Sequence, residues 1–481
     1  MICALSLVFM LCAEPIDLGS RRELFVDRAL IESTTNVELR LHEPVPREVA
    51  LVFDASWEGN SCGYVTVFQD GDLFRMYYRG GAQTFKGDPP AHEHTTCYAE
   101  STDGIHWSKP DLSLVEFGGS KSNNIFWTGE ASHNFVPFKD ENPACPPEAR
   151  YKAVALEQGG LRAFQSADGI HWTRLRDEPI ITQGAFDSQN LVFRDPLREE
   201  YRAYWRDFQN GLRDIKTAVS KDFLTWSEPM WLSYPGAPAE ELYTNQILPY
   251  FRAPHILLGF PTRYLDRGWS ESMRALPELE HRLKRSEDSP REGTALTDGL
   301  FMSSRDGAEF LRWDRVFLRP GLRTAGNWVY GDNYQAWGII ETPSPIEDAP
   351  KELSIFATEG YWTGSSCQLR RFTLRTDGFV SASASNAGGE LVTKPIRFSG
   401  DKLALNFSTS AAGSIRIEIQ DANGTPIPGF TLADAPEIFG DALDQVVPWK
   451  DNHTLAELSG KPVRLRLVMK DADIYAFRFL E

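Results

Sequence analysis

Short apolar runs separated by polar turns fill the chain from residue 63 to residue 374. The runs are rich in Val, Ile, Tyr, Phe and Trp, and they are bounded by Gly, Pro and Asp. This pattern is typical of β-strands joined by tight turns. The runs fall into groups of three, and each group is followed by a similar short phrase. Internal repeats therefore dominate the organisation of the chain.

The repeated phrase is clearest in STDGIHWSKP at 101–110, which returns as SADGIHWTRL at 166–175. Looser copies are SKDFLTWSEP at 220–229 and SSRDGAEFLRW at 303–313, and RTDGFVSA at 375–382 is a degenerate fifth copy. An Asp-Gly pair suits a tight hairpin because Gly adopts positive φ without steric cost. We therefore interpret the aspartates and histidines of these phrases as scaffold residues on an outer rim.

Five cycles of three strands, phrase and fourth strand predict an all-β fold, with a five-bladed β-propeller over residues 20–385. We expect N-terminal strands at 23–32 and 37–44 to close the fifth blade. A β-sandwich whose hairpins resemble one another by chance is the alternative. A helical pattern at 270–288 is interrupted by Pro277, and we interpret it as a surface excursion over one mouth of the propeller.

From residue 386 to residue 481 apolar and polar positions alternate strictly, and the complete phrase does not return. This alternation predicts a separate C-terminal β-sandwich. A length of 481 residues agrees with two domains.

The formal net charge is −17, and 12% of the residues are aromatic. A strongly acidic protein is a poor partner for nucleic acid and for anionic membranes. Abundant aromatic residues and an acidic balance suit neutral or cationic sugars. The composition therefore favours a carbohydrate substrate as partner, with no nucleic acid and no membrane span.

Residues 1–13, MICALSLVFMLCA, form an apolar run too short to span a membrane. They resemble the hydrophobic core and cleavage site of a secretory signal peptide, which predicts a secreted or periplasmic protein. A buried N-terminal strand is the alternative. The later cysteines have no CxxC spacing and indicate neither zinc nor redox chemistry; they are Cys62, Cys97, Cys145 and Cys367.

In a propeller, the residues just before each inner strand ring one mouth of the central channel. These positions carry polar and aromatic side chains, which are, blade by blade, Asp54 and Glu58; His133 and Asn134; Asp187; Glu240, Glu241 and Asn245; and Trp328, Tyr330 and Asp332. Carboxylates therefore gather at this mouth in several blades.

Two carboxylates across one cleft can hydrolyse a glycosidic bond, with one ionised as nucleophile or base and one protonated as acid. Packing several carboxylates together raises the pKa of at least one, which keeps that acid protonated. Flat aromatic faces for sugar rings would come from Trp57, Trp328, Tyr330 and Trp362.

The five-blade pattern followed by a β-sandwich resembles glycoside hydrolase families 32 and 68 together with family 43, the invertase, levanase and arabinanase group. The resemblance implies an Asp in blade one as base or nucleophile, a supporting Asp in blade three and a Glu in blade four as general acid. By position, Asp187 matches the blade-three Asp, and Glu240 or Glu241 matches the acid. In blade one, SWEGNSCGY replaces the family's WMNDPNG-like segment, so Glu58 or Asp54 would take that role.

The run Phe193-Arg194-Asp195-Pro196 contains the short RDP motif of these families. In the families this motif opens the inner strand, whereas here it lies between the apolar runs SQNLVF and EYRAYW. We therefore interpret it as a hairpin turn, and we favour Asp187 over Asp195 as the blade-three carboxylate.

The leading interpretation is a secreted glycoside hydrolase that requires no cofactor, with a structural calcium ion left open. The phrase S-x-D-G-x-x-W is one residue shorter than the Asp box of sialidases, but those enzymes have six blades and a trio of arginines that is not apparent here. Five-bladed mannoside phosphorylases are also similar, yet they need a basic phosphate pocket. A non-catalytic carbohydrate-binding propeller would lack the carboxylate pair.

Overall fold

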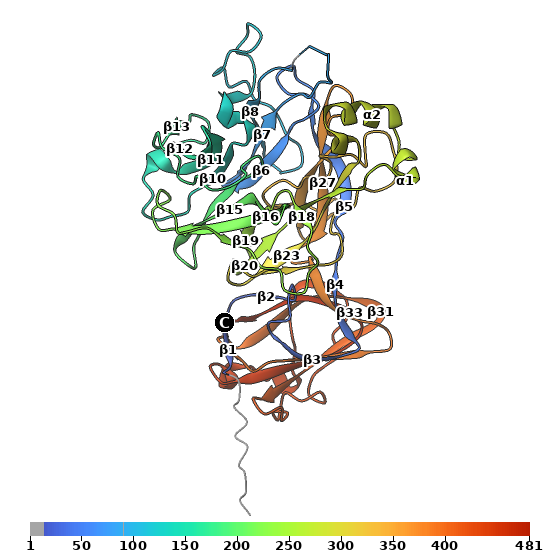
Figure 1. The fold of residues 1–481 in the computed structure, drawn as a ribbon. Coiled ribbons are helices and arrows are strands. Elements are labelled where there is room, and N and C mark those ends of the chain that lie inside the picture. The colour runs from blue at the N-terminus through green and yellow to red at the C-terminus, as the bar shows by residue number, and fades with distance from the viewer. Residues whose placement is uncertain (1–13, 90) are drawn as a thin grey trace, which may run out of the picture. The chain divides into compact units, whose positions relative to one another are not determined.

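The computed structural model describes residues 14–89 and 91–481, so the predicted signal segment at 1–13 lies outside the described residues. The chain forms two compact units, both built almost entirely of β-strands as the sequence predicted (Figure 1). The larger unit comprises residues 43–376, and the smaller unit comprises 14–42 together with 377–481. Among the described residues, no helix is long and apolar enough to cross a membrane.

The larger unit contains five four-stranded antiparallel sheets, which follow one another along the chain. Each predicted group of strands forms one of these sheets. Their strands are β6 (Gly63–Asp70), β7 (Leu73–Gly80), β8 (Thr95–Ser101) and β9 (Ile125–Thr128); β10 (Val136–Lys139), β11 (Tyr151–Glu157), β12 (Gly160–Ser166) and β13 (Thr173–Arg174); β14 (Leu191–Asp195), β15 (Glu200–Gln209), β16 (Leu212–Ser220) and β17 (Met230–Trp231); β19 (Leu248–Tyr250), β20 (Ala253–Gly259), β23 (Met302–Ser304) and β24 (Leu311–Arg312); and β25 (Ile340–Thr342), β26 (Glu352–Glu359), β27 (Cys367–Arg375) and β5 (Val45–Phe53).

The fifth sheet is closed by an N-terminal strand, but not by the strands that the sequence suggested. Strand β5 pairs with β27, with Phe53 opposite Cys367 and Val45 opposite Thr373. The predicted closing segments 23–32 and 37–44 instead pair their strands within the smaller unit. The prediction was wrong because alternation shows that a segment has a buried face but does not show which sheet covers it.

The fourth sheet carries an insertion between β20 and β23. The insertion contains β21 (Thr262–Asp266) and β22 (Ala295–Gly299), with α1 (Glu271–Arg274), α2 (Leu279–Asp288) and the 3-10 turn Pro290–Gly293 between them. Its two strands join β18 (Glu241–Leu242), which precedes β19, in a three-stranded sheet. The predicted helical segment therefore forms two helices that are separated at Pro277. Both helices lie together at one side of the larger unit (Figure 1). Two further 3-10 turns span Glu130–His133 and Pro147–Ala149.

The smaller unit joins ten strands in one sheet. They are β1 (Ile16–Gly19), β2 (Glu23–Leu24), β3 (Ile31–Thr35), β4 (Val37–Leu41), β28 (Val380–Ala384), β29 (Gly389–Thr393), β30 (Ile396–Phe398), β31 (Lys402–Asp421), β32 (Asp441–Val446) and β33 (Val463–Leu480). Two 3-10 turns, Lys450–Asn452 and Ala456–Leu458, follow β32. The alternating side chains of β31 and β33 contribute to one hydrophobic cluster, which includes Ile417 and Leu467.

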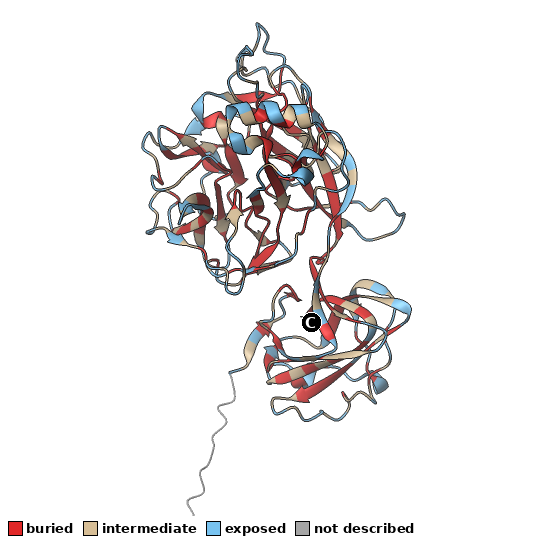
Figure 2. Ribbon diagram, turned by 45° about the vertical axis from the view of Figure 1, so that its right-hand side comes forward, coloured by how far each residue is buried: buried red, intermediate tan, exposed pale blue. Residues whose placement is uncertain are grey.

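The observed division differs from the predicted boundaries of 20–385 and 386–481. Residues 14–42 and 377–385 belong with the C-terminal strands, since β4 pairs with β28 and β3 pairs with β29. In both units the buried residues follow the strands (Figure 2). Apolar strand residues are buried on both faces in the larger unit, as in β11, which explains why its strands read as continuous apolar runs.

The repeated phrase forms the same turn in four sheets, between the third and the fourth strand. In the first copy, the backbone N–H groups of Ile105 and His106 both donate to Asp103 Oδ1 at 2.8 Å, and Gly104 N–H donates to Ser101 Oγ at 2.9 Å. The same bonds recur in the copies that begin at Ser166, Ser220 and Ser304. We call these four segments the Ser–Asp turns. Their aspartates and histidines are scaffold residues, as predicted.

Candidate active site

A cavity of about 900 Å³ lies in the larger unit. Its lining draws on the start of the first strand, or on the segment that leads into it, in each of the five sheets. One member from each sheet is Tyr64, His133, Asp187, Tyr243 and Tyr330. We call it the tyrosine cavity, because Tyr64, Tyr243, Tyr330, Tyr334 and Tyr361 all line it. Four residues singled out from the sequence line this cavity; they are His133, Asp187, Tyr330 and Trp362.

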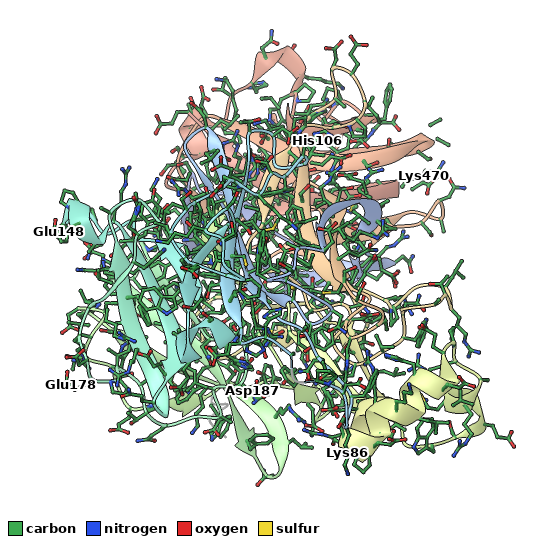
Figure 3. The ribbon with its side chains drawn as sticks, turned by 90° about the horizontal axis from the view of Figure 1, so that it is seen from above. Lys86, His106, Glu148, Glu178, Asp187 and Lys470 are labelled. Atoms are coloured by element: carbon green, nitrogen blue, oxygen red, sulfur yellow. The ribbon has the colours of Figure 1, made fainter. Side chains whose placement is uncertain are left out.

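Asp187 is the best-supported carboxylate of the cavity. Its Oδ1 accepts a hydrogen bond from His133 Nε2 at 2.8 Å, and its Oδ2 lies 3.4 Å from the Tyr243 hydroxyl and 3.7 Å from Arg206 Nη2. Burial among the cavity walls would raise the pKa of Asp187, but the His133 hydrogen bond and the Arg206 charge outweigh it and hold the pKa well below its usual range. The side chain still has 59% exposure, because it faces the open cavity. Figure 3 shows Asp187 well apart from His106 of a Ser–Asp turn.

A second histidine extends this arrangement. His94 Nδ1 lies 3.3 Å from His133 Nδ1. Burial, followed by the nearby charge of Arg79, lowers the pKa of His94 to about 3, so that this ring is neutral at pH 7. When His133 is neutral, its Nε2–H donates to Asp187 and its Nδ1 can accept from His94. The line from Asp187 to His94 can therefore fix the orientation and the tautomer of the His133 ring.

The tyrosines contribute a different kind of surface to the cavity, because each side chain has an apolar ring and a polar hydroxyl group at its tip. The Arg79 guanidinium lies 4.6 Å from the centre of the Tyr64 ring, and the Arg206 guanidinium lies 4.7 Å from that of Tyr243. Burial raises the pKa of Tyr64, Tyr330 and Tyr334 well above the usual value. Their hydroxyls are therefore protonated at neutral pH and can donate hydrogen bonds to a ligand.

Glu292 is a second carboxylate of the cavity, and it was missed in the sequence. It belongs to the 3-10 turn Pro290–Gly293 of the insertion, and it is half-buried. Its side chain makes no hydrogen bond or ion pair with another described residue. Burial raises the pKa of Glu292, although the charge of Arg285 opposes this shift. The signal that could have found it is the insertion itself, because the other four sheets have no helical segment of this length.

The blade-one candidates lie outside the lining of the cavity. Glu58 is buried, where it accepts hydrogen bonds from the Tyr78 hydroxyl at 2.7 Å and from Lys109 Nζ at 2.6 Å. Asp54 is exposed and faces Lys109 at 3.5 Å. Both carboxylates therefore neutralise Lys109 and hold the loop that leads into β6.

The blade-four candidates are also engaged elsewhere. Glu240 pairs with Arg263 at 2.7 Å and with Arg312 at 3.2 Å. Glu241 pairs with Arg213. Neither side chain lines the tyrosine cavity. Glu241 lies in β18 of the three-stranded sheet, and Glu240 directly precedes it. The ion pairs that hold both side chains could not be read from one sequence.

The remaining candidates mostly support the backbone. Asn134 donates to two carbonyls and accepts from Leu156 N–H, and Asn245 Oδ1 accepts from Ile247 N–H at 3.3 Å. Asp332 is buried and accepts from Tyr361 N–H at 2.9 Å.

The predicted aromatic platforms are largely packed against protein. Trp57 Nε1 donates to Asn124 and Trp328 Nε1 donates to the Gly321 carbonyl, and neither ring lines the tyrosine cavity. Trp362 does line it, but the ring is stacked on Phe85 with 5.3 Å between ring centres.

Three buried glutamines lie just before the first strands of the third, fourth and fifth sheets. Gln246 Nε2 donates to Gln189 Oε1 at 2.7 Å and to the Gln335 carbonyl at 2.6 Å, and Gln189 Nε2 donates to the Val65 carbonyl at 3.0 Å. A second cavity of about 540 Å³ is lined by the other ends of the same first strands, with Phe138, Phe193, Phe251 and Trp337 among its apolar residues. We call it the apolar cavity.

Metal-binding side chains do not cluster in the part of the chain that the structure describes. Within residues 14–89 and 91–481, no group of three or more His, Cys, Asp or Glu residues is placed to hold a metal ion. The described cysteines, Cys62, Cys97, Cys145 and Cys367, are free thiols.

Comparisons with known proteins give distant similarities. No protein-family model matches the chain. The uncharacterized proteins MT1551 and Rv1502 of Mycobacterium tuberculosis are each 27% identical over 143 residues, which cover 28% of this chain and 41% of theirs. The chain thus matches less than half the length of these relatives.

Solved structures with similarity to the chain include glycoside hydrolases. The GH32 beta-fructofuranosidase BmSUC1 of Bombyx mori is 9% identical, with 92% of this chain and 94% of that chain covered and a TM-score of 0.38. The catalytic domain of the GH62 alpha-L-arabinofuranosidase of Coprinopsis cinerea is 9% identical, with coverage of 70% and 99% and a TM-score of 0.42.

An N-acetylgalactosamine deacetylase from F. plautii is 11% identical, with coverage of 70% and 96% and a TM-score of 0.42. These three proteins have different activities, and identities of 9–11% do not assign any of them to this chain. Function is therefore best sought in the side chains of the tyrosine cavity.

Proposed function

We propose that this chain is a glycoside hydrolase that cleaves glycosidic bonds in the tyrosine cavity. One observation carries the proposal: the cavity holds two carboxylates whose surroundings shift their pKa values in opposite directions. The pKa of Asp187 is lowered, and the pKa of Glu292 is raised. Pairs of this kind mark an acid and a base in glycoside hydrolysis.

The proposed reaction uses side chains of this chain alone and requires no cofactor. Glu292, in its protonated form, gives its proton to the glycosidic oxygen as the bond from that oxygen to the anomeric carbon breaks. Asp187, in its ionised form, either attacks the anomeric carbon or takes a proton from the attacking water. His133 and Arg206 stabilise the Asp187 carboxylate, and the tyrosine rings offer faces and hydroxyl groups to the sugar.

The larger unit is proposed to be a five-bladed β-propeller, and the smaller unit is proposed to be a β-sandwich. Contacts between successive sheets support a closed ring. Tyr77 in the first sheet donates to the Gly169 carbonyl in the second at 3.1 Å, and Tyr204 in the third donates to the Gly307 carbonyl in the fourth at 2.9 Å.

Contacts at the other three junctions also support this ring. Tyr201 of the third sheet donates to Asp140, next to the second sheet, at 2.6 Å. Trp337, which leads into the fifth sheet, donates its Nε1–H to the Ile247 carbonyl beside the fourth sheet at 2.9 Å. Val67 N–H of the first sheet donates to the Trp337 carbonyl at 2.8 Å. The fifth sheet therefore meets the first, as a closed propeller requires.

The proposed location is outside the cytoplasm, either secreted or periplasmic. It rests on the apolar character of residues 1–13 and on their resemblance to a signal peptide.

The proposal is tested by the release of reducing sugar from a panel of plant and algal glycans. We would compare the wild-type protein with Asp187→Asn, Glu292→Gln and the double variant Glu240→Gln/Glu241→Gln. We expect hydrolysis by the wild type, loss of activity in the first two variants and retained activity in the double variant if it is folded. Loss in the double variant with retention in Glu292→Gln would move the acid to the fourth-sheet pair that the sequence favoured. Binding of glycans without any turnover would contradict the enzyme and support a carbohydrate-binding protein.

A further inference from the structure

Arg79 is a buried cation in the wall of the tyrosine cavity, and no described carboxylate lies within ion-pair distance of it. It lies on β7, and only 7% of the residue is exposed. Its Nη2 donates to the Ser61 carbonyl at 2.8 Å and lies 3.4 Å from the Tyr361 hydroxyl. Its Nε has no hydrogen-bond partner, and the guanidinium forms no ion pair with any described carboxylate. Burying a charge is costly unless the charge is paired.

Most other buried arginines of the larger unit are paired with carboxylates. Arg202 pairs with Asp195, Arg312 pairs with Glu240, and Arg213 pairs with Glu241. Arg206 lies 3.7 Å from Asp187. Most buried arginine charges in this unit are therefore stabilised by ion pairs, and the charge of Arg79 is not.

Arg282 and Arg285 are further exceptions, but their surroundings differ. Each donates to two backbone carbonyls, and neither lines the tyrosine cavity. Arg79 differs from both because it lines the tyrosine cavity, a space that a ligand can occupy.

Two further donors of the same wall are buried without a partner. The Tyr334 hydroxyl and Trp362 Nε1 have no hydrogen-bond partner among the described residues, and their residues are 9% and 4% exposed. Arg and Trp side chains can only donate hydrogen bonds. A ligand group that contacts Arg79 must therefore carry acceptor oxygens, and the charge of Arg79 selects an anionic group among them.

The carboxylates of the lining do not offset this charge by contact. Glu93 and Glu130 are exposed, Asp187 is held by His133 and Arg206, and Glu292 makes no ion pair. Interactions between exposed charges decay over about 8–10 Å in physiological salt. A contact with Arg79 therefore matters more to a bound group than the net charge of −17 of the whole chain.

We propose that Arg79 binds an anionic oxygen group of the substrate, such as the carboxylate of a uronic acid or a sulfate ester, so that the substrates are acidic glycans. This inference rests on the proposed function in that it calls the ligand a substrate. The binding of an anionic sugar at Arg79 does not depend on turnover. It reverses the expectation of neutral or cationic sugars, which was based on composition.

The test is isothermal titration calorimetry with matched sugars. The ligands are glucuronic acid and galacturonic acid against glucose and galactose, and glucose 6-sulfate against glucose. The proteins are the wild type, Arg79→Gln, Arg79→Lys and the control Arg323→Gln, which removes an exposed arginine of the same unit. A thermal melt of each protein checks that it is folded.

We expect the wild type and Arg323→Gln to bind at least one acidic sugar about tenfold or more tightly than its neutral partner, as an added charge-assisted contact implies. Arg79→Gln should lose this preference. Arg79→Lys should keep part of it, because Lys retains the charge but not the planar fork. The comparison of the uronic acids with glucose 6-sulfate shows whether the anionic group is a carboxylate or a sulfate ester.

Equal binding of acidic and neutral sugars by the wild type would overturn the proposal, and so would a preference that persists in folded Arg79→Gln. If Arg79→Gln does not fold, a full preference in Arg79→Lys with no dependence on salt would have the same effect. An Arg79-dependent preference without hydrolysis of any glycan would retain this site and reject the hydrolase. If neutral glycans are hydrolysed in a reaction that needs Asp187 and Glu292, but acidic sugars are not preferred, the hydrolase is retained and the anion site at Arg79 is rejected.

Discussion

The Ser–Asp turns and the tyrosine cavity belong to the same set of sheets, yet they differ in sequence and in the range of their contacts. The turns repeat almost the same residues in four sheets and make the same hydrogen bonds each time. The segments around the starts of the first strands contribute His133, Asp187 and several tyrosines instead, so their residues vary between sheets. Repetition therefore marks the scaffold in this chain, and departure from repetition marks the residues suited to chemistry.

The physical reason is the range of the contacts. In a Ser–Asp turn, Asp103 binds backbone groups two and three residues away. In the cavity, His133 and Asp187 meet although they are 54 residues apart. Local bonds can be repeated with a local sequence, whereas a site between sheets needs one particular residue from each sheet.

The largest effect should separate the two regions directly. Asp187→Asn should lower kcat on a hydrolysed glycan by about a thousandfold, because general acid–base groups contribute about 10²–10⁴-fold. Asp168→Asn changes the same residue type in a Ser–Asp turn and should leave kcat nearly unchanged. Steady-state kinetics of both variants measures the contrast. Equal losses in the two variants would remove the distinction between scaffold and site.

Glu292→Gln should have the next largest effect, and the effect should depend on the leaving group. We expect a loss of about a hundredfold on natural glycans and a much smaller loss on dinitrophenyl glycosides, whose leaving group needs no proton. The raised pKa of Glu292 also predicts that activity falls as the pH rises through that pKa, because the acid loses its proton. This alkaline limb should disappear in Glu292→Gln.

The matched control for this experiment is Glu130→Gln, an exposed carboxylate that also lines the tyrosine cavity. It should keep the alkaline limb and show no dependence on the leaving group. If Glu130→Gln behaves like Glu292→Gln, the role of proton donor cannot belong to Glu292 specifically.

A smaller effect, now on stability, is expected in the turns. Asp222→Ala removes the acceptor for the N–H groups of Leu224 and Thr225 and should lower the free energy of unfolding by about 1–2 kcal/mol, at about 1 kcal/mol for each hydrogen bond. Asp177→Ala, at an exposed position outside the turns, should change it little. Urea denaturation measures the free energy of unfolding of both variants. An unchanged free energy in Asp222→Ala would contradict the structural role of the turns.

The last effect should appear in the pH dependence of stability. The pKa of His94 is lowered to about 3 in the folded protein, against about 6.5 in an unfolded chain. The unfolded chain therefore takes up a proton first as the pH falls, so stability is lost between about pH 6.5 and pH 3. His94→Gln should flatten the decline of unfolding free energy from pH 6.5 to pH 4. The exposed His453→Gln serves as control, and an unchanged slope in His94→Gln would contradict the assigned shift.

The sequence alone could predict the groups of strands because turn residues and apolar runs are local signals. It also predicted the turn that follows Asp195, where β14 ends and β15 begins at Glu200. It could not tell that β5 rather than β4 pairs with β27, since both strands alternate. Partners distant in the chain decide such pairings.

For the candidate site, position within the repeat was enough to select Asp187, His133 and Tyr330. It was not enough for Glu240 and Glu241, whose carboxylates are held by arginines from other strands. Glu292 and Arg79 were missed for opposite reasons. Glu292 lies in an insertion that the repeat does not describe, and Arg79 lies inside a strand, where only the cavity distinguishes it from a scaffold arginine.

The pairing of β5 with β27 has a consequence for synthesis. The ribosome makes β5 near the beginning of the larger unit and β27 at its end, so the last sheet stays incomplete until residue 375 has emerged. The smaller unit is split around the larger one in sequence, and β2 waits for β33 in the same way. Long-range pairings of this kind are slow to form, because the entropy of closing a long loop is lost before the stabilising contacts are made. Nascent chains of this protein should therefore carry unpaired strand edges for most of their translation, and they should depend on chaperones more than proteins whose domains are completed one after another.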